Sequence, residues 1–177
     1  MEGDYQAFEA RVEEVGGFLL LRLPEEVSRA LPSRGMGMGE GDINRRPFTL
    51  PLEPDGRGGH WLELKGEHAG NVQAGSLVSL RLRPAIDWPE PSLPEDLGKA
   101  LQQEGLSDAW AACTVRARWE WIRWARATGN PATREKRVKV ACDKLRKGER
   151  RPCCFNASSC TLSQVCKSGV LDPPGAG

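Results

Sequence analysis

The sequence predicts an α+β protein, with a small β-barrel in its N-terminal half followed by a three-helix appendage. Short period-two segments separated by turn residues fill residues 5–85, whereas helical periodicity with capping residues fills residues 92–148. A proline-rich segment, Trp88-Pro89-Glu90-Pro91-Ser92, separates the two patterns. We therefore expect a barrel domain over residues 1–88, a helical region over 89–150 and a cysteine-containing tail over 151–177.

Alternating side chains predict the strands of the barrel. Phe8, Ala10 and Val12 alternate with charged neighbours, and residues 18–23 form an apolar run of strand length that ends at Pro24. Further strands are predicted at residues 46–52, 60–65 and 77–83, with a helical turn at 24–31 and a hairpin turn at 54–59. Short strands joined by tight turns are typical of a small closed or partly closed barrel.

Residues 35–41, with glycine at every second position, allow two interpretations. Glycine-rich backbone can cradle a phosphate. However, the segment lacks the Gly-Lys-Ser/Thr ending of a phosphate-binding loop, and no strong helical pattern follows it. We therefore expect a flexible or bulged entry to a strand.

Capping residues predict where the helices begin. Ser92-Leu93-Pro94-Glu95 has the spacing of a capping box and opens the first helix. Ser107 caps a second helix that extends to about Thr128. Asn130-Pro131 combines an N-cap with proline at the first helical position, and so opens the third helix.

Charge is distributed unevenly along the chain. Residues 1–113 hold 11 Lys/Arg against 19 Asp/Glu, whereas residues 114–152 hold 13 Lys/Arg against 4 Asp/Glu. The net charge of +1 therefore conceals an acidic first part and a basic second part. The basic part is either a surface for an acidic partner or the complement of the acidic part of the same chain.

The predicted second helix is rich in arginine and tryptophan and allows two interpretations. Its arginines would face phosphates while a tryptophan stacks on bases, or Trp110, Trp121 and Trp124, at helical spacing, would pin the helices against the barrel. Trp119 lies off that stripe and is the tryptophan expected to be exposed. The candidate ligand- or nucleic-acid-binding residues are Arg116, Trp119, Arg123, Arg126, Arg134, Arg137 and Lys139.

Two of these candidates have a structural alternative. Arg134 and Arg137 would pair with acidic barrel residues such as Glu53 or Asp55 if the basic and acidic parts neutralise each other.

Acid–base catalysis has little support in the sequence. The two histidines, His60 and His68, lie among strand and loop residues without a partner evident from the pattern. The carboxylates are scattered, and no motif marks a pair of them. We therefore expect a protein that is not an enzyme.

The N-terminus and the apolar runs indicate a cytoplasmic protein. The first residues are acidic and lack the basic-then-apolar layout of a signal peptide. No apolar run approaches the roughly 20 residues needed to span a bilayer. The six cysteines are therefore expected to be reduced thiols or metal ligands. Cys113 and Cys142 fall on predicted helix faces and are expected to be small buried side chains.

The other four cysteines crowd into the tail and allow three interpretations. Cys153, Cys154 and Cys160 would bind zinc or iron, although zinc ligands are usually two to four residues apart and these are adjacent or farther apart. A reactive or redox thiol is the second interpretation, because Arg150 and Arg151 lie beside them. The third interpretation, which we favour, is that the tail cysteines pack on the helices, and that the chain frays beyond Leu171.

A series of short motifs carries a family resemblance. The motifs are Leu23-Pro24-Glu25-Glu26-Val27, Gly41-Asp42-Ile43-Asn44, Leu52-Glu53-Pro54-Asp55-Gly56, Pro94-Glu95-Asp96-Leu97, Trp121-Ile122, Thr133-Arg134 and Arg151-Pro152-Cys153-Cys154-Phe155-Asn156. In this order they resemble the bacterial YdeI/OmdA family, labelled bacteriocin-protection or OmpD-associated, with its N-terminal domain of unknown function. The resemblance implies a double-split β-barrel in the first half and a role in bacterial stress such as bacteriocin exposure. It transfers no catalytic residue.

The sequence therefore predicts a non-enzymatic cytoplasmic bacterial protein that binds an unknown protein or nucleic acid through a basic helical face. One alternative is a nucleic-acid-binding protein that uses the arginine- and tryptophan-rich helices. The other is a thiol-redox or metal-binding protein that uses the tail cysteines. No cofactor is expected, apart from zinc or iron in that last case.

Overall fold

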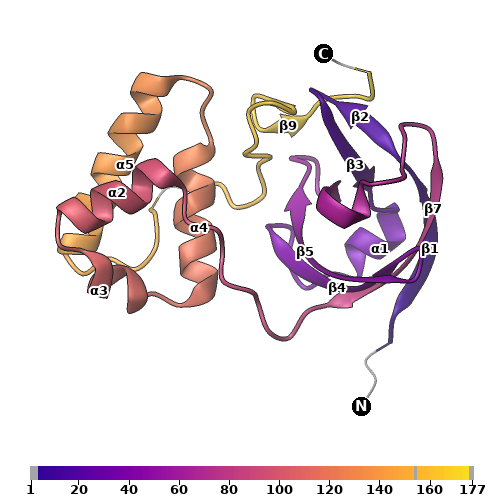
Figure 1. The fold of residues 1–177 in the computed structure, drawn as a ribbon, viewed down its shortest axis with the longest axis horizontal. Helices are drawn as coiled ribbons and strands as arrows, with labels where there is room; N and C mark the ends of the chain where they lie inside the picture. Colours follow the sequence, from indigo (N-terminus) through magenta and orange to yellow (C-terminus); the bar gives the residue numbers. More distant parts are fainter. Residues whose placement is uncertain (1–3, 154, 176–177) are drawn as a thin grey trace. The chain divides into compact units, whose positions relative to one another are not determined.

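Seven antiparallel strands in the described residues form one barrel-like sheet, in the order β1-β7-β4-β5-β6-β3-β2 (Figure 1). The structure is a computed structural model that describes residues 4–153 and 155–175. The strands are β1 Gln6–Arg11, β2 Glu13–Val15, β3 Phe18–Arg22, β4 Gly37–Ile43, β5 Arg46–Pro54, β6 His60–Leu64 and β7 Leu77–Pro84. Val12 alone separates β1 from β2, so one stretch of chain joins the two ends of the strand order. The predicted α+β class with a barrel-type sheet is confirmed.

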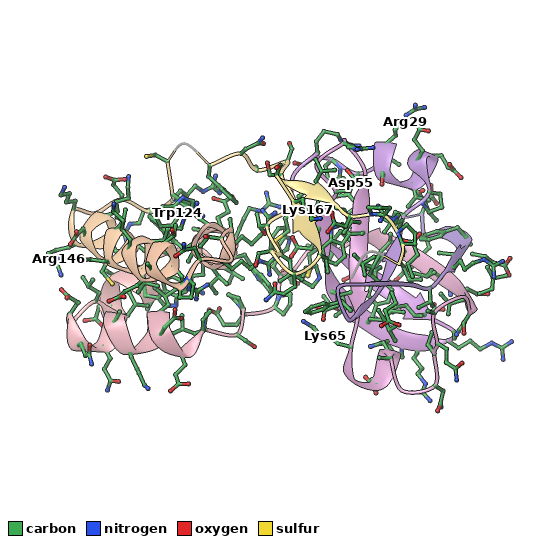
Figure 2. The ribbon with its side chains drawn as sticks, turned by 90° about the horizontal axis from the view of Figure 1, so that it is seen from above. Arg29, Asp55, Lys65, Trp124, Arg146 and Lys167 are labelled. Atoms are coloured by element: carbon green, nitrogen blue, oxygen red, sulfur yellow. A yellow bond between two sulfur atoms is a disulfide. The ribbon has the colours of Figure 1, made fainter. Side chains whose placement is uncertain are left out.

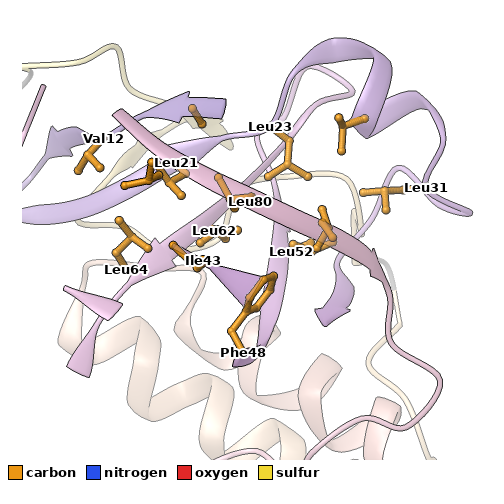
Figure 3. Packing of buried hydrophobic residues seen from close by; sticks show 14 residues of the cluster. Val12, Leu21, Leu23, Leu31, Ile43, Phe48, Leu52, Leu62, Leu64 and Leu80 are labelled. Atoms are coloured by element: carbon orange, nitrogen blue, oxygen red, sulfur yellow. The ribbon is translucent and has the colours of Figure 1, made fainter. Parts of the chain in front are cut away.

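The core of this sheet follows from alternation along the strands. In β7, Val78, Leu80 and Leu82 are buried while the residues between them face outward. The short helix α1, Glu25–Arg29, adds Val27, and Leu31 follows it into the same cluster. Figure 3 shows these side chains filling the space that the strands enclose.

Strand β4 corrects the expectation for the glycine-rich segment. It is a regular seven-residue strand that pairs with β5 on one side and β7 on the other. A Cβ atom at Gly41, where φ is 154°, would overlap the carbonyl oxygen of Arg81, and one at Gly39 would crowd Leu82 and Leu52. At Gly39 and Gly41, glycine is required because neighbouring strands and core side chains approach closely, and the strand is neither bulged nor a phosphate loop.

Two compact units make up the chain, Met1–Asp87 with Ala157–Cys160 and Val165–Gly177, and Trp88–Asn156 with Thr161–Gln164. The described part of the second unit contains four helices where three were predicted. They are α2 Glu95–Gln103, α3 Ser107–Ala111, α4 Val115–Arg126 and α5 Pro131–Arg146. The predicted second helix breaks before Thr114, whose backbone is extended and whose Oγ1 accepts the Ala117 N–H at 3.1 Å.

The other two helix starts test the capping predictions. Asn130 is the N-cap of α5, since its Oδ1 accepts the N–H groups of Ala132 and Thr133, which confirms that prediction. The predicted capping box at Ser92 is wrong: α2 begins after Pro94, which is extended and makes no side-chain cap. The prolines of this segment hold the chain extended until Glu95, so Ser92 lies too far ahead of the helix.

The core of the helical unit contains the tryptophan that helical spacing predicted to be structural. Trp121 is 0% exposed, and its indole N–H donates to the Arg150 carbonyl at 2.9 Å. Its ring meets Trp124 edge to face, with centroids 6.0 Å apart. Trp110 and Trp124 pack partly buried against the same cluster, so all three stabilise the packing of the helices.

Most of the described residues of the tail belong to the first unit. A small hairpin of β8 (Cys166–Lys167) and β9 (Val170–Leu171) donates the Leu171 N–H to the Asp55 carbonyl at 2.9 Å. The amide of Gly175 donates to Glu14, so the predicted fraying beyond Leu171 is wrong for the described residues. Figure 2 labels Asp55 and Lys167 in this region.

Two of the tail cysteines form a disulfide. Cys160 is bonded to Cys166 across Cα atoms 6.1 Å apart, which differs from the reduced thiols that the sequence predicted. The predicted burial of Cys113 and Cys142 is confirmed. Among the helices that the structure describes, none is long and apolar enough to cross a bilayer.

Candidate functional site

Three side chains of α4 contact the proline-rich segment that precedes α2. Two of them, Arg116 and Trp119, are candidate binding residues, and the third is the neighbouring Arg118. The Arg116 guanidinium lies 4.4 Å from the centroid of the Trp88 ring. Arg118 Nη2 donates to Glu90 at 2.8 Å, and the Trp119 indole N–H donates to the Pro89 carbonyl at 2.9 Å. Trp119 is therefore half-buried with its N–H engaged, where the sequence predicted an exposed ring.

Arg123 does not lie on the exposed face that its spacing predicted. It is 1% exposed, and its guanidinium lies 5.5 Å from the centroid of the Phe155 ring. Phe155 is distant in sequence, so helical periodicity alone could not reveal that it covers this side of the helix. Arg123 is therefore a packing residue of the helical unit.

The arginines of α5 pair within the helical unit. Arg134 donates two parallel hydrogen bonds of 2.8 Å to Asp96, and this contact is the main reason that the pKa of the Asp96 carboxyl lies below its ordinary value. Arg137 donates to the Trp124 carbonyl at 2.6 Å and stacks on that ring at 5.4 Å. Both arginines thus have partners within the helical unit, and their pairing with Glu53 or Asp55 stays a prediction.

A cavity of about 370 Å³ brings two of the candidate arginines together. It opens where α4 ends and α5 begins, and Arg126 and Arg134 both line it. Hydroxyl and amide side chains complete its wall, namely Thr128, Asn130, Ser163 and Gln164. No sequence pattern indicated Ser163 and Gln164, which come from the tail, about thirty residues beyond Asn130.

The remaining basic candidate lies in solvent. Lys139 is exposed on α5 and, like Lys136, makes no ion pair or hydrogen bond with the residues that the structure describes. These two lysines therefore provide an uncompensated positive charge on that helix.

The tail cysteines do not assemble a metal site in the described residues, among which no group of three or more potential ligands gathers. Cys160, in its disulfide, has no thiolate to offer, and the predicted ligand Cys154 lies outside the described residues. Cys153 is exposed, with its Sγ 3.1 Å from Lys144 Nζ. This contact, followed by that with Glu149, raises the pKa of the Lys144 ammonium.

Both histidines contact backbone carbonyl groups. The His60 ring is 2% exposed, with Nε2 3.0 Å from the Gly35 carbonyl oxygen, and burial lowers the pKa of this imidazole below its ordinary 6.5. The His68 Nε2 lies 2.9 Å from the Pro47 carbonyl oxygen. Each ring is thus used to stabilise a loop beside the sheet.

Together these features define a protein with a barrel-like domain and a basic helical domain. Residues 90–148 match the OmdA family model, described as bacteriocin-protection, YdeI or OmpD-associated, and residues 8–82 match DUF1905, a domain of unknown function. The chain belongs to this bacteriocin-protection, YdeI or OmpD-associated family and carries the DUF1905 domain ahead of the OmdA domain. The resemblance seen in the sequence is confirmed. No curated protein and no solved structure matches the chain.

Proposed function

We propose that this protein is a non-enzymatic binding module whose helical unit binds anionic groups of a partner. The observation that carries the proposal is the cavity at the junction of α4 and α5, which Arg126 and Arg134 both line. Guanidinium groups bind carboxylates and phosphates, and the neighbouring hydroxyl and amide side chains supply further hydrogen bonds.

The charge around this cavity supports an anionic partner. Residues 114–152 carry 13 Lys/Arg against 4 Asp/Glu. Asp96 already neutralises Arg134 in part, so the cavity alone is expected to bind weakly. The affinity is expected to come from a partner that also reaches the exposed lysines of α5.

A nucleic acid is the second candidate, and the exposed Lys136 and Lys139 favour it. Both side chains lie in solvent without a partner in the described residues, as side chains that neutralise a phosphate backbone must. The family description, bacteriocin protection, names a phenotype and not a reaction, and a binding role is compatible with it.

The uses of both histidines support a role without catalysis. His60 is buried against the Gly35 carbonyl and His68 faces the Pro47 carbonyl, so neither ring is presented to a cavity as a general base.

A tryptophan fluorescence titration at two salt concentrations tests the proposal, because Trp124, labelled in Figure 2, belongs to the helical unit and its ring lies 5.4 Å from the Arg137 guanidinium. The probes are single-stranded DNA, single-stranded RNA and inorganic pyrophosphate. We expect saturable quenching by at least one probe that weakens as salt rises. The double variant K136Q/K139Q should weaken the binding of the oligonucleotides, whereas Arg126→Gln should weaken the binding of pyrophosphate.

Lys65→Gln is the control, because this exposed lysine belongs to the barrel-like unit and pairs with Glu63 at 3.3 Å. It should leave every titration unchanged. The absence of saturable binding for all three probes at low salt would overturn the anionic-partner proposal. Binding that Lys65→Gln weakens as much as K136Q/K139Q would show that the attraction is unspecific.

A further inference from the structure

The turn between β4 and β5 places an arginine in a backbone conformation that arginine rarely adopts. Ile43 pairs with Arg46, so Asn44 and Arg45 form a two-residue hairpin loop, with φ angles of 49° and 68°. Positive φ at both positions is the pattern of a type I′ turn, whose second position favours glycine. Because an arginine occupies a position where glycine fits better, a role for its side chain is a reasonable hypothesis.

Arg45 is also unmatched in charge. Its side chain is exposed and makes no ion pair or hydrogen bond with any residue in the described part of the chain. The neighbouring arginines of β7 are paired: Arg81 lies 3.6 Å from Asp42, and Arg83 lies 2.7 Å from Glu40. Those two acidic residues are therefore largely neutralised, while Arg45 is not.

Two open cavities adjoin this turn. One of about 660 Å³ and one of about 780 Å³ are both lined by Asp42, Arg45 and Arg81. The first also contains Glu9 of β1, and the second contains Tyr5 and Glu40. Their sizes are those of small-molecule sites.

Glu9 provides a second unmatched charge. Its carboxylate is exposed and has no ion-pair or hydrogen-bond partner among the residues described. Glu9 is paired in register with Ser79, whose N–H donates to Asn44 Oδ1 at 3.0 Å. Glu9 and Arg45 thus belong to the two chain segments that flank Ser79.

We infer that this surface, the Arg45 site, binds a small zwitterion, with its oxyanion group on Arg45 and its ammonium group on Glu9. Glu9 would repel a purely anionic ligand, and Arg45 would repel a purely cationic one. A molecule with both charges is therefore the best electrostatic match. The oxyanion is a carboxylate or a phosphate, both of which guanidinium binds.

Tyr5 makes the inference measurable. It is the one tyrosine of the sequence, and the guanidinium groups of Arg81 and Arg83 lie 4.7 and 4.6 Å from its ring centroid. In the protein labelled with ¹³C at the tyrosine Cζ atom, Tyr5 therefore gives one NMR signal that reports on the Arg45 site. The probes are γ-aminobutyrate, phosphoethanolamine, and the singly charged analogues butyrate and butylamine.

We expect the zwitterions to shift the Tyr5 signal saturably, and to bind about three- to fivefold more tightly than either singly charged analogue, the factor that one exposed ion pair provides. The stronger of γ-aminobutyrate and phosphoethanolamine identifies the oxyanion as carboxylate or phosphate. No saturable shift with any probe, or equal affinity for all four, would overturn the inference.

The matched variant is Arg45→Gly, since glycine suits the turn. It should raise the melting temperature and yet remove the preference for γ-aminobutyrate over butylamine. Glu9→Gln should remove the preference for γ-aminobutyrate over butyrate. Arg57→Ala, an exposed arginine that lines neither cavity, should change nothing. An Arg45→Gly protein that keeps the full preference for an oxyanion contradicts the assignment.

Discussion

Among single residues, His60 gives the clearest link between environment and stability. Burial lowers the pKa of this imidazole, and among the described residues none forms a hydrogen bond with its Nδ1 atom. In the unfolded chain the ring binds a proton near its ordinary pKa of 6.5, whereas in the folded protein it does so only at lower pH. The unfolded state therefore holds more protons just below pH 6.5.

We expect the free energy of unfolding to be greatest above pH 6.5 and to fall as the pH decreases below that value. Urea denaturation across this range measures it. His60→Gln should flatten the dependence, whereas His68→Gln, at the half-buried second histidine, should retain it. An identical pH profile for the two variants would show that His60 is not the group responsible.

Gly41 is a position in β4 where there is no room for a Cβ atom. A Cβ atom there would overlap the Arg81 carbonyl oxygen, and φ of 154° is unfavourable for other residues. Gly41→Ala should lower the free energy of unfolding by about 2 kcal/mol or more, measured by urea denaturation. Gly37→Ala is the control in the same strand, because no atom lies within 4 Å of the added Cβ. Equal losses in both variants would contradict the close-approach explanation.

Residue roles could be predicted where they depend on near neighbours in sequence. Helical spacing identified Trp121 as a packing residue, and it is fully buried. The same spacing placed Arg123 on the surface, because Phe155, which lies over it, is separated from it by the whole of α5. Trp119 likewise donates to Pro89, a partner outside the helix that periodicity describes.

At the scale of the elements, the caps of the helices decide where each begins. Thr114 and Asn130 accept backbone N–H groups at the starts of α4 and α5, so Thr114→Ala and Asn130→Ala should each lower the free energy of unfolding by about 1 kcal/mol. Ser92→Ala should be neutral, since Ser92 is exposed and does not cap α2. Chemical denaturation of the three variants compares them. If Ser92→Ala lowered the free energy of unfolding as much as Thr114→Ala does, Ser92 would be a cap of α2 after all.

Strand and helix types could be predicted well, and their boundaries and surroundings less well. The alternation around Leu80 and Leu82 reports which side of β7 is buried, and it needs no knowledge of the rest of the fold. Gly39 and Gly41 of β4 were misleading because the reason for them lies in Leu82, Leu52 and Arg81, all on other strands. The break before Thr114 was hidden within an apolar stripe of helical spacing.

The candidate site was predicted in composition but not in geometry. Basic residues of α4 and α5 were identified, yet Arg126 and Arg134 line a cavity together with Ser163 and Gln164 of the tail. Nothing in the local pattern around Ser163 marks it as a neighbour of those arginines. Arg45 was missed because an exposed arginine in a hairpin turn is unremarkable until its φ angle is known.

Across the whole molecule, the return of the tail to the first unit is the feature that sequence patterns did not indicate. Leu171 donates to Asp55, and a Cβ atom at Gly56 would overlap the Gly169 carbonyl oxygen. Gly56→Ala should therefore displace the tail hairpin and raise the exchange rate of the Leu171 amide by on the order of tenfold or more. Hydrogen-exchange NMR measures this rate.

Gly58→Ala is the matched control for Gly56→Ala. Its φ of 89° is as unfavourable for alanine as the 82° of Gly56, but the added Cβ would meet no atom within 4 Å. It should cost backbone strain without releasing the tail. Slow exchange of Leu171 in Gly56→Ala would mean that the hairpin does not depend on this contact.

The chain leaves the first unit at Asp87 and returns to it at Ala157, and this interrupted path constrains how the protein is made. A ribosome delivers the seven strands first, but the segment that accepts from Arg22 and donates to Glu14 and Asp55 arrives only after the helical unit has been synthesised. While the helices are synthesised, the Arg22 guanidinium and the carbonyl groups of Glu14 and Asp55 therefore lack these partners. Biosynthesis of the first unit is thus completed last, although it is begun first.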